Sequence, residues 1–258
     1  MSEGAVRYRR DGVVGWILFD RPEARNAMTW TMYEQLAEAC VRAAADRELR
    51  AVVMRGVGGK AFIAGTDIGQ FRSFKCAADG IEYERKMEPY LAAIEALPMP
   101  TLAVVEGWAI GGGLAIAAAC DLRIATPGTR FGVPIARTLG NCLSVANYAR
   151  LVAALGVSRA KKMLLLAENL PADEALAAGF LAEIVAPEAL EARIAALTAR
   201  LAGGAPITLR VTKEAIRRLL HAGMPDGEDL IAQAYGSADF RTGVEAFLAK
   251  QEPRWTGI

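Results

Sequence analysis

Two short glycine-containing segments carry the residues whose types and spacing could do chemistry. The first, GGKAFIAGTDIGQF at 58–71, runs from a strand-like stretch through a turn to Thr66. The second, VEGWAIGGGLAIAAACD at 105–121, passes from a strand through three consecutive glycines at 111–113 into a predicted helix. Backbone N–H groups at turns and helix N-termini attract negative charge. Two such groups directed at one oxygen would form an oxyanion hole, which stabilises an enolate or a tetrahedral oxyanion.

The glycine triplet also has a purely structural explanation. A residue without a Cβ lets a helix pack closely on a strand, and this needs no ligand. Nucleotide binding fits less well: the run from Gly56 to Lys60 follows a strand, yet AFIAG after it does not open a helix as a dinucleotide loop would. Ala61 follows Lys60, where a phosphate-binding Walker A loop requires Ser or Thr. An oxyanion hole and close packing remain as the two interpretations.

The composition restricts histidine and cysteine chemistry. The one histidine, His221, is predicted at a helix end near Gly223, and no G-x-S-x-G motif accompanies it. This argues against a Ser-His-Asp or Cys-His mechanism. The four cysteines form no C-x-x-C pair and have no histidine nearby: Cys40, Cys76, Cys120 and Cys142. We predict no metal site and expect a reducing, cytoplasmic location.

Alternating strands and helices must hold the two turns in place. Short apolar runs rich in β-branched residues predict strands at 13–20, 50–56, 101–107 and 121–126. Thr31 and Glu34 form a capping box that predicts a helix start between the first two strands. The buried face of this helix is predicted at Tyr33, Leu36, Cys40 and Ala44. The pattern predicts an α/β fold with crossover helices.

The last third of the chain is predicted to be almost entirely helical. After a strand at 181–187, helices are expected at 187–202, 206–221 and 240–250. Glycine- and proline-containing turns separate them, and no repeat or low-complexity linker interrupts the sequence. We therefore expect one domain that ends in a helical region.

Length and charge exclude several function classes. The 258 residues are 53% hydrophobic, which is enough for a sizeable buried core. Thirty basic residues against 29 acidic ones leave a net charge of +1, so no overall field attracts nucleic acid or an anionic membrane. The N-terminus lacks the apolar segment of a secretory signal, and the uncharged stretch 107–120 is shorter than the ~20 residues of a membrane span. We expect neither a nucleic-acid nor a membrane partner.

Several motifs, in one order, resemble those of the enoyl-CoA hydratase/isomerase (crotonase) superfamily. They cover almost the whole chain: DRPEARNAMT, KAFIAGTDI, VEGWAIGGGLAIAAACDLRIA, FGVPIA, LPADEALAAGFLAEIV and VEAFLAKQEPRW. The resemblance implies a crotonase-like spiral of ββα units followed by helices for trimerisation, as a homotrimer or a dimer of trimers. It divides the chain into an acyl-CoA-binding core, 1–200, and a helical region for oligomerisation, 201–258.

The resemblance also implies which residues form the site. The two oxyanion-hole amides of the family correspond to Thr66 and Gly112, with the thioester carbonyl of an acyl-CoA substrate between them. Coenzyme A is then part of the substrate, and no separate cofactor is expected. Arg25 and Lys250 would lie near its phosphates, although each could instead be an ordinary solvated charge. The full set of implied coenzyme A contacts is Ala24, Arg25, Ala27, Ala64, Asp67, Ile68 and Lys250.

The chain departs from the family at both acid/base positions. Hydratases of the family use two glutamates, one placed two residues after the glycine triplet and one after the proline of F-G-x-P-E. Here these positions hold Ala115 and Ile135, and neither side chain can transfer a proton. General acid–base help contributes about 10²- to 10⁴-fold in rate. We therefore do not expect simple hydration by the usual pair of carboxylates.

Some relatives instead place an aspartate several residues after the F-G-x-P segment. The corresponding stretch, 136–151, has no carboxylate and offers Asn141, Cys142 and Ser144. Asn141 and Ser144 could hydrogen-bond a substrate or water but exchange no proton near pH 7. Cys142 could act as a nucleophile if its pKa were lowered, but a cysteine without a histidine partner is more often simply buried.

Three functions fit these residues. The first is a lyase or isomerase of the hydratase type whose acid/base groups lie elsewhere, for example on the acidic helix with Glu82, Glu84 and Glu88; these carboxylates could also form a solvated face. The second is decarboxylation of a malonyl-type CoA thioester, in which departing CO₂ leaves the enolate without a general base. The third is non-catalytic binding of acyl-CoA.

Overall fold

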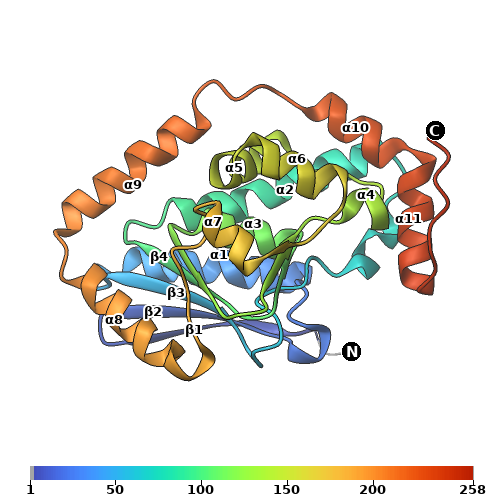
Figure 1. Cartoon of the computed structure of the whole chain (residues 1–258). Helices are drawn as coiled ribbons and strands as arrows, with labels where there is room; N and C mark the ends of the chain where they lie inside the picture. Colours follow the sequence, from blue (N-terminus) through green and yellow to red (C-terminus); the bar gives the residue numbers. More distant parts are fainter. Residues whose placement is uncertain (1–2, 258) are drawn as a thin grey trace.

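Six strands form the main sheet, in the order β1-β2-β3-β4-β6-β9. The structure, a computed structural model, describes residues 3–257 (Figure 1). β1 and β2 are antiparallel, and the other neighbours in this sheet are parallel. The six strands are β1 (Ala5–Asp11), β2 (Val14–Asp20), β3 (Ala51–Gly56), β4 (Thr101–Val105), β6 (Leu122–Ala125) and β9 (Glu183–Ile184). A second sheet consists of β5 (Trp108–Ile110), β7 (Arg130–Gly132) and β8 (Leu170–Pro171).

Helices connect these strands and continue beyond them. Those before residue 166 are α1 (Trp30–Ala45), α2 (Ala77–Glu95), α3 (Gly112–Ala119), α4 (Ile135–Thr138), α5 (Val145–Leu155) and α6 (Val157–Leu165). The later ones are α7 (Ala172–Ala177), α8 (Leu190–Ala202), α9 (Pro206–His221), α10 (Glu228–Gly236) and α11 (Ala238–Ala249). Three short 3₁₀ helices add to them: η1 (Pro22–Ala24), η2 (Ile68–Ser73) and η3 (Pro187–Ala189).

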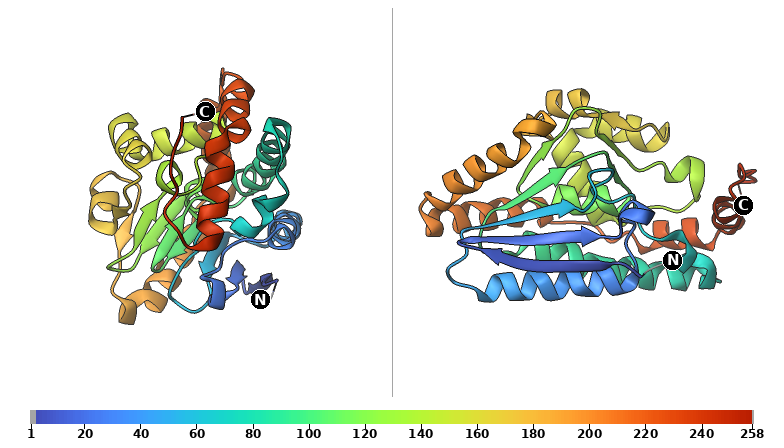
Figure 2. Two further views of the ribbon diagram at one scale, coloured as in Figure 1. Left: turned by 90° about the vertical axis from the view of Figure 1, so that its right-hand side faces the viewer. Right: turned by 90° about the horizontal axis from the view of Figure 1, so that it is seen from below.

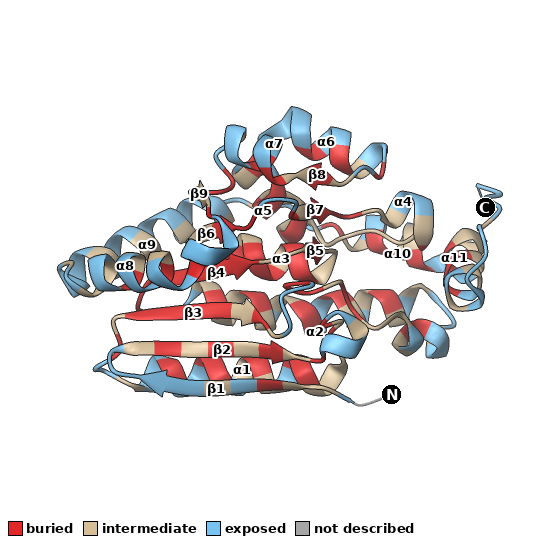
Figure 3. Ribbon diagram, turned by 60° about the horizontal axis from the view of Figure 1, so that its bottom comes forward, coloured by how far each residue is buried: buried red, intermediate tan, exposed pale blue. Residues whose placement is uncertain are grey.

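Helices cover both faces of the main sheet, because successive strand residues point to opposite sides. On one side Val52 and Met54 of β3 join the main core, to which α1 contributes Leu36. On the other side Val53 of β3 packs in a smaller cluster with Ile194 of α8. Figure 2 shows β1 and β2 lying along α1, and Figure 3 shows that β3 is buried over most of its length.

The C-terminal helices contact the rest of the chain unequally. α10 and α11 close a third apolar cluster, in which Phe240 packs against both Phe71 of η2 and Tyr235 of α10. α9 has no buried residue and runs along the outside of the molecule (Figure 1). The division of the chain at residue 200 into a core and an oligomerisation region stays a prediction. Within the described residues, α10 and α11 pack directly against the core.

The structure confirms the α/β prediction and corrects several details. β2, β3, β4 and β6 lie within the four predicted strands. The N-cap of α1 is Thr29, whose hydroxyl accepts from the Met32 amide, so the capping box predicted at Thr31 is wrong. Its buried face continues through Ala43, whereas Ala44 is exposed. The strand predicted at 181–187 is reduced to two residues, and β1 and α10 were not predicted.

The helices and the metal-ligating side chains of the described residues bear on possible partners. No helix within residues 3–257 is long and apolar enough to cross a membrane. In the same part of the chain, no group of His, Cys, Asp and Glu side chains is placed to hold a metal ion.

Candidate active site

The two glycine-containing turns lie against each other. Ile63 forms a parallel bridge with Ala109 of β5, which places the AGTD turn beside the start of α3. A Cβ built on Gly112 would lie 3.2 Å from the Thr66 hydroxyl oxygen and 2.4 Å from that of Tyr33. Gly112 therefore sits where any side chain would collide with Tyr33.

The amides of Thr66 and Gly112 have no acceptor among the described residues. Thr66 forms an isolated β-bridge with Met28. The two hydrogen bonds of this bridge involve the Gly65 carbonyl and the Asp67 amide, so the Thr66 amide takes part in neither. Gly112 is the first residue of α3, where an N–H has no intrahelical acceptor. The neighbouring Gly111 amide is used, because it donates to the Gly132 carbonyl at 2.8 Å.

Backbone conformation and close packing explain why the other two residues of the triplet are glycines. Gly111 has φ +53°, a left-handed conformation that favours glycine. A Cβ on Gly113 would lie 2.2 Å from the Ile63 carbonyl oxygen, so α3 approaches that segment as closely as the packing interpretation requires. Close packing thus accounts for Gly113, and the free amide belongs to Gly112.

Two tyrosine hydroxyl groups fix the Thr66 side chain. Its Oγ1 lies 2.9 Å from the Tyr33 hydroxyl and 3.4 Å from that of Tyr83. Tyr33 is buried and Tyr83 is half-buried, and desolvation raises the pKa of Tyr33 to about 12 and that of Tyr83 well above its usual value. Both phenols therefore stay protonated at neutral pH and act as hydrogen-bonding groups.

A cavity of about 40 Å³ opens beside Gly112. Its walls come from α1, α2, α3 and the segment around α5, and they include Tyr33, Glu84, Ala115 and Asn147. This volume admits a few water-sized groups and is far below the ~300–1,000 Å³ of typical ligand pockets. Ala115 thus faces the cavity, whereas Ile135 is the half-buried first residue of α4 and is not part of its lining.

Glu84 brings a carboxyl group to this cavity. It lies on the inner face of α2 and is only 5% exposed. Its Oε1 accepts a hydrogen bond from the Tyr235 hydroxyl at 3.0 Å, and its Oε2 accepts one from the Ser144 amide at 3.1 Å. Burial raises the pKa of Glu84 to about 7, with Glu88 adding to the rise and the two hydrogen bonds opposing it.

Glu82, Glu84 and Glu88, the three carboxyl groups singled out on α2, thus have different environments. Glu82 is exposed, as a solvated face predicts, and Glu88 forms an ion pair with Arg150. Glu84 alone of the three lines the cavity.

The raised pKa of Glu84 has a measurable effect on stability. The folded protein holds this proton up to about pH 7, while the unfolded chain releases it near the ordinary value of 4.5. The free energy of unfolding should therefore fall as pH rises through this window, because the folded state binds more protons. Urea unfolding of wild type and Glu84→Gln at about pH 5 and about pH 7.5 measures the difference. A wild-type-minus-variant difference that does not change with pH contradicts the raised pKa.

The loop before α5 supports Glu84. Asn141 donates from Nδ2 to the Tyr235 hydroxyl at 3.1 Å, and the Ser144 hydroxyl caps α5 by accepting from the Asn147 amide. Cys142 is half-buried, and burial followed by the charge of Glu84 raises its pKa to about 12. This is the opposite of the lowered pKa that a nucleophilic role requires.

The predicted coenzyme A segments meet at one edge of the molecule. The Ala64 amide donates to the Arg25 carbonyl at 3.0 Å, so the turns holding Ala24–Ala27 and Ala64–Ile68 are neighbours. Asp67 forms an ion pair with Arg21 at 2.8 Å and caps η2 by accepting from the Gly69 amide. Lys250 is exposed at the C-terminal end of α11. The roles of all these residues toward coenzyme A stay predictions.

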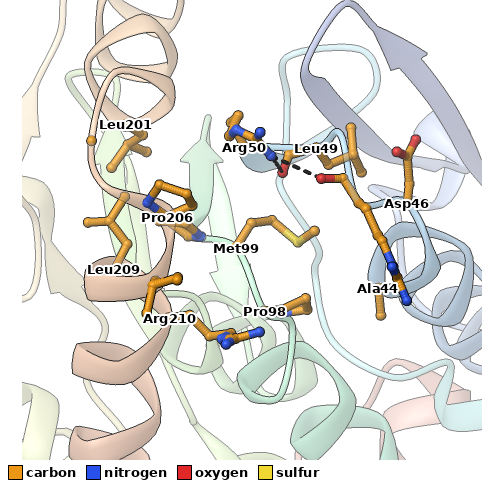
Figure 4. A pocket seen from close by; sticks show the side chains of 14 residues that line it. Ala44, Asp46, Leu49, Arg50, Pro98, Met99, Leu201, Pro206, Leu209 and Arg210 are labelled. Carbon is orange, nitrogen blue, oxygen red and sulfur yellow. Dashed lines mark hydrogen bonds between the residues drawn. The ribbon is translucent and has the colours of Figure 1, made fainter.

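Larger cavities lie elsewhere, around α9. Figure 4 shows one of about 480 Å³ between the segment Ala44–Arg50 and the start of α9, and another of about 520 Å³ lies on the same helix near Lys213. In Figure 4 the Arg50 guanidinium donates to the carbonyls of Arg47 and Leu49. Both cavities lie between α9 and the rest of the molecule. Neither is lined by the turn at Thr66 or by the glycine triplet.

A buried charge cluster braces α2 and α5. Arg150, 4% exposed, donates to Glu95 at 2.7 Å and to Glu88 at 2.8 Å. His221 ends α9 as predicted, and its Nε2 lies 3.0 Å from Glu95 Oε2. Burial alone would raise the pKa of Glu95, but Arg150 and His221 together lower it.

Comparison with known proteins identifies the family. The family described as enoyl-CoA hydratase/isomerase matches residues 9–258. The chain belongs to this family. One relative, the probable enoyl-CoA hydratase of Rhodobacter capsulatus, is 36% identical over 265 residues, with 100% of each chain covered. This confirms the superfamily resemblance.

Solved structures of similar proteins confirm the crotonase fold. An enoyl-CoA hydratase from Mycobacterium avium subsp. paratuberculosis superimposes with a TM-score of 0.83 at 29% identity, covering 97% of this chain and 98% of that one. A methylmalonyl-CoA decarboxylase in complex with 2-nitronate-propionyl-CoA gives a TM-score of 0.88 at 25% identity, covering 98% of both chains. Proteins of this fold thus include a hydratase and a decarboxylase of acyl-CoA thioesters.

Sequence reasoning missed Tyr235. It lies on α10, which was not predicted because the preceding Pro-Asp-Gly was interpreted only as a turn. A signal was present: Ile231 and Tyr235 are four residues apart, and acidic residues occupy the first turn of the helix, as its dipole favours.

Proposed function

We propose that this protein binds an acyl-CoA thioester and stabilises its enolate with the backbone amides of Thr66 and Gly112. The observation that carries this proposal is the convergence of the two turns. The Thr66 side chain lies within 3.2 Å of a Cβ built on Gly112, and neither amide has a protein acceptor among the described residues. Two donors preorganised for one oxygen stabilise the charge that develops there.

The surroundings of the two amides support this role. Tyr33 and Tyr83 hold the Thr66 side chain, so the turn does not need to reorganise when charge appears. The cavity beside Gly112 is small and largely apolar, and hydrogen bonds to an oxyanion are stronger where water is excluded. Its volume of about 40 Å³ favours a short acyl group near the carbonyl.

Coenzyme A would lie along the edge formed by Ala24–Ala27 and Ala64–Ile68. The hydrogen bond between Ala64 and Arg25 holds these two segments together. Arg25 is exposed there and is available to a phosphate. Lys250 would complete the phosphate site from the C-terminal region.

Decarboxylation of a malonyl-type thioester is the second candidate. It is favoured by the aliphatic residues at 115 and 135 and by the similarity to a methylmalonyl-CoA decarboxylase. When the carboxylate carbon leaves as CO₂, the electron pair of the breaking C–C bond becomes the enolate, and no base is needed. The same two amides would stabilise that enolate.

Self-association as a trimer or a dimer of trimers is part of the proposal. α9 exposes Ile207, Val211 and Leu219, and Leu219 is 77% exposed. These residues recur at helical spacing, and an apolar stripe of this kind is usually covered by a partner. We expect sedimentation equilibrium to give three or six copies per particle, and a monomer would contradict this.

A thioester panel tests the function. Butyryl-, crotonyl- and methylmalonyl-CoA are each added to the protein, with free coenzyme A as the control, and melting temperature and product masses are measured. We expect the thioesters to raise the melting temperature more than coenzyme A does. Addition of water to crotonyl-CoA indicates a hydratase, and CO₂ release from methylmalonyl-CoA indicates a decarboxylase. Stabilisation without product indicates a binding protein, and failure to bind any thioester contradicts the proposal.

A further inference from the structure

We propose that Glu84 is the residue that exchanges a proton with the α-carbon of the bound thioester. The inference rests on the proposed function, because it needs a thioester carbonyl at Gly112. It adds an acid/base group to a site whose glycine-containing turns supply hydrogen-bond donors alone.

The first argument is position. Glu84 of α2 and Gly112 of α3 line the same cavity. A carbonyl oxygen bound at the Gly112 amide would bring its α-carbon into this space. Among the described residues that line this cavity, the other titratable groups are Tyr33 and Tyr83. Desolvation raises the pKa of both, so both stay protonated at neutral pH. Glu84 is therefore the lining residue that can gain and lose a proton near neutral pH.

The second argument is orientation. The Tyr235 hydroxyl holds one carboxyl oxygen of Glu84, and the Ser144 amide holds the other. Asn141 in turn donates to the Tyr235 hydroxyl. A carboxylate can accept about four hydrogen bonds, so these two leave accepting positions for a substrate proton. Tyr235, Ser144 and Asn141 are positioning residues in this scheme.

The third argument is charge. The titratable groups around Glu84 are Glu88 on its own helix, the phenols of Tyr33, Tyr83, Tyr148 and Tyr235, and the Cys142 thiol. None of the ion pairs recorded among residues 3–257 includes Glu84, since Arg150 is engaged by Glu88 and Glu95. Without a cationic partner a buried carboxyl group keeps its proton to higher pH, which suits both proton removal and proton return.

The chemical step balances without a co-reactant. The Glu84 carboxylate takes a proton from the α-carbon, and the electron pair of that C–H bond forms the C=C bond of the enolate. The carbonyl π pair moves onto oxygen, where the two amides hold it. In the reverse direction the enolate carbon takes the proton back from Glu84. In D₂O the carboxyl group carries deuterium, so the α-position becomes labelled.

Deuterium exchange of butyryl-CoA tests the proposal. We expect wild type to label the α-carbon in D₂O and Glu84→Gln to do so at least 100-fold more slowly, with a Kd for butyryl-CoA within threefold of wild type. Glu82→Gln is the matched control, because it makes the same change on the exposed face of α2. It should exchange like wild type.

Tyr235→Phe separates proton transfer from a merely structural role. The Tyr235 hydrogen bond lowers the pKa of Glu84, so its loss should move the midpoint of the exchange rate against pH upward. An unchanged midpoint overturns the proposal, and this variant decides the matter if Glu84→Gln does not fold.

The remaining outcomes separate this inference from the proposed function. Exchange by a folded Glu84→Gln within threefold of wild type overturns the inference and leaves enolate stabilisation intact. Wild type that binds butyryl-CoA without labelling it also overturns the inference. Wild type that neither binds nor labels the thioester overturns both.

Discussion

Removing the Gly112 amide is expected to lower the rate of α-proton exchange about 10²- to 10³-fold, the usual effect of losing one oxyanion-hole donor. Proline is the direct substitution because it lacks the N–H and is tolerated at the first position of a helix. A Cβ at this position would also collide with the Tyr33 hydroxyl at 2.4 Å. Gly112→Pro is therefore combined with Tyr33→Phe, which removes that hydroxyl.

The matched control is the double variant Gly112→Ala/Tyr33→Phe. It has the same Tyr33 change and a Cβ at 112, but it keeps the amide. With the Tyr33 hydroxyl gone, the nearest atom to the new Cβ is the Thr66 hydroxyl oxygen at 3.2 Å, which a small shift accommodates. Exchange of butyryl-CoA and its Kd are measured for both proteins. Equal exchange rates in the two double variants would show that the Gly112 amide has no role.

Replacing Arg150 with Met is expected to destabilise the fold by about 3–5 kcal/mol at pH 7, because two carboxylates lose the partner of a buried ion pair. Arg150 is 4% exposed and contacts both Glu88 and Glu95. Urea unfolding measures the change. Arg159→Met on the exposed face of α6 is the matched control and should stay within about 0.5 kcal/mol of wild type.

The loss in Arg150→Met should depend on pH. In the wild type the lowered pKa of Glu95 contributes stability above its unfolded value, and that contribution disappears as pH falls through the folded pKa. In the variant Glu95 keeps only His221 of its two partners, so this pH-dependent contribution is smaller from the start. The difference between the two proteins should therefore shrink toward about pH 4. A difference that grows in acid would contradict this assignment of the cluster.

The glycine-containing turns could be predicted from sequence because their signal is local. In the second segment the strand β5, the turn at Gly111 and the start of α3 follow each other directly. In the first segment the predicted strand-like stretch is reduced to an isolated β-bridge at Ile63, and the 3₁₀ helix η2 follows the turn. The sequence alone could not show that the three glycines of the triplet are required for different reasons. Gly113 is explained by the Ile63 carbonyl and Gly112 by the Tyr33 hydroxyl, and both contacts come from other parts of the chain.

The carboxyl group of the site was only partly predictable. The acidic helix was identified as a possible source of acid/base groups, but its spacing does not say which glutamate is buried. Glu84 is distinguished by Tyr235 and Ser144, which lie far from it in sequence. The capping box at Thr31 failed for a related reason. Thr29, two residues earlier, is also a residue type that caps helices, and the helix starts there.

The hydrogen bond between Glu84 and Tyr235 joins residues 151 positions apart. Closing so long a loop is entropically costly, so this contact forms only after the intervening chain has collapsed. A growing polypeptide on the ribosome would therefore hold both glycine-containing turns well before it acquires Tyr235. The proposed catalytic carboxyl group would gain its second hydrogen bond among the last events of biosynthesis, and carboxypeptidase trimming that reaches α10 would remove that bond and leave only the one from Ser144.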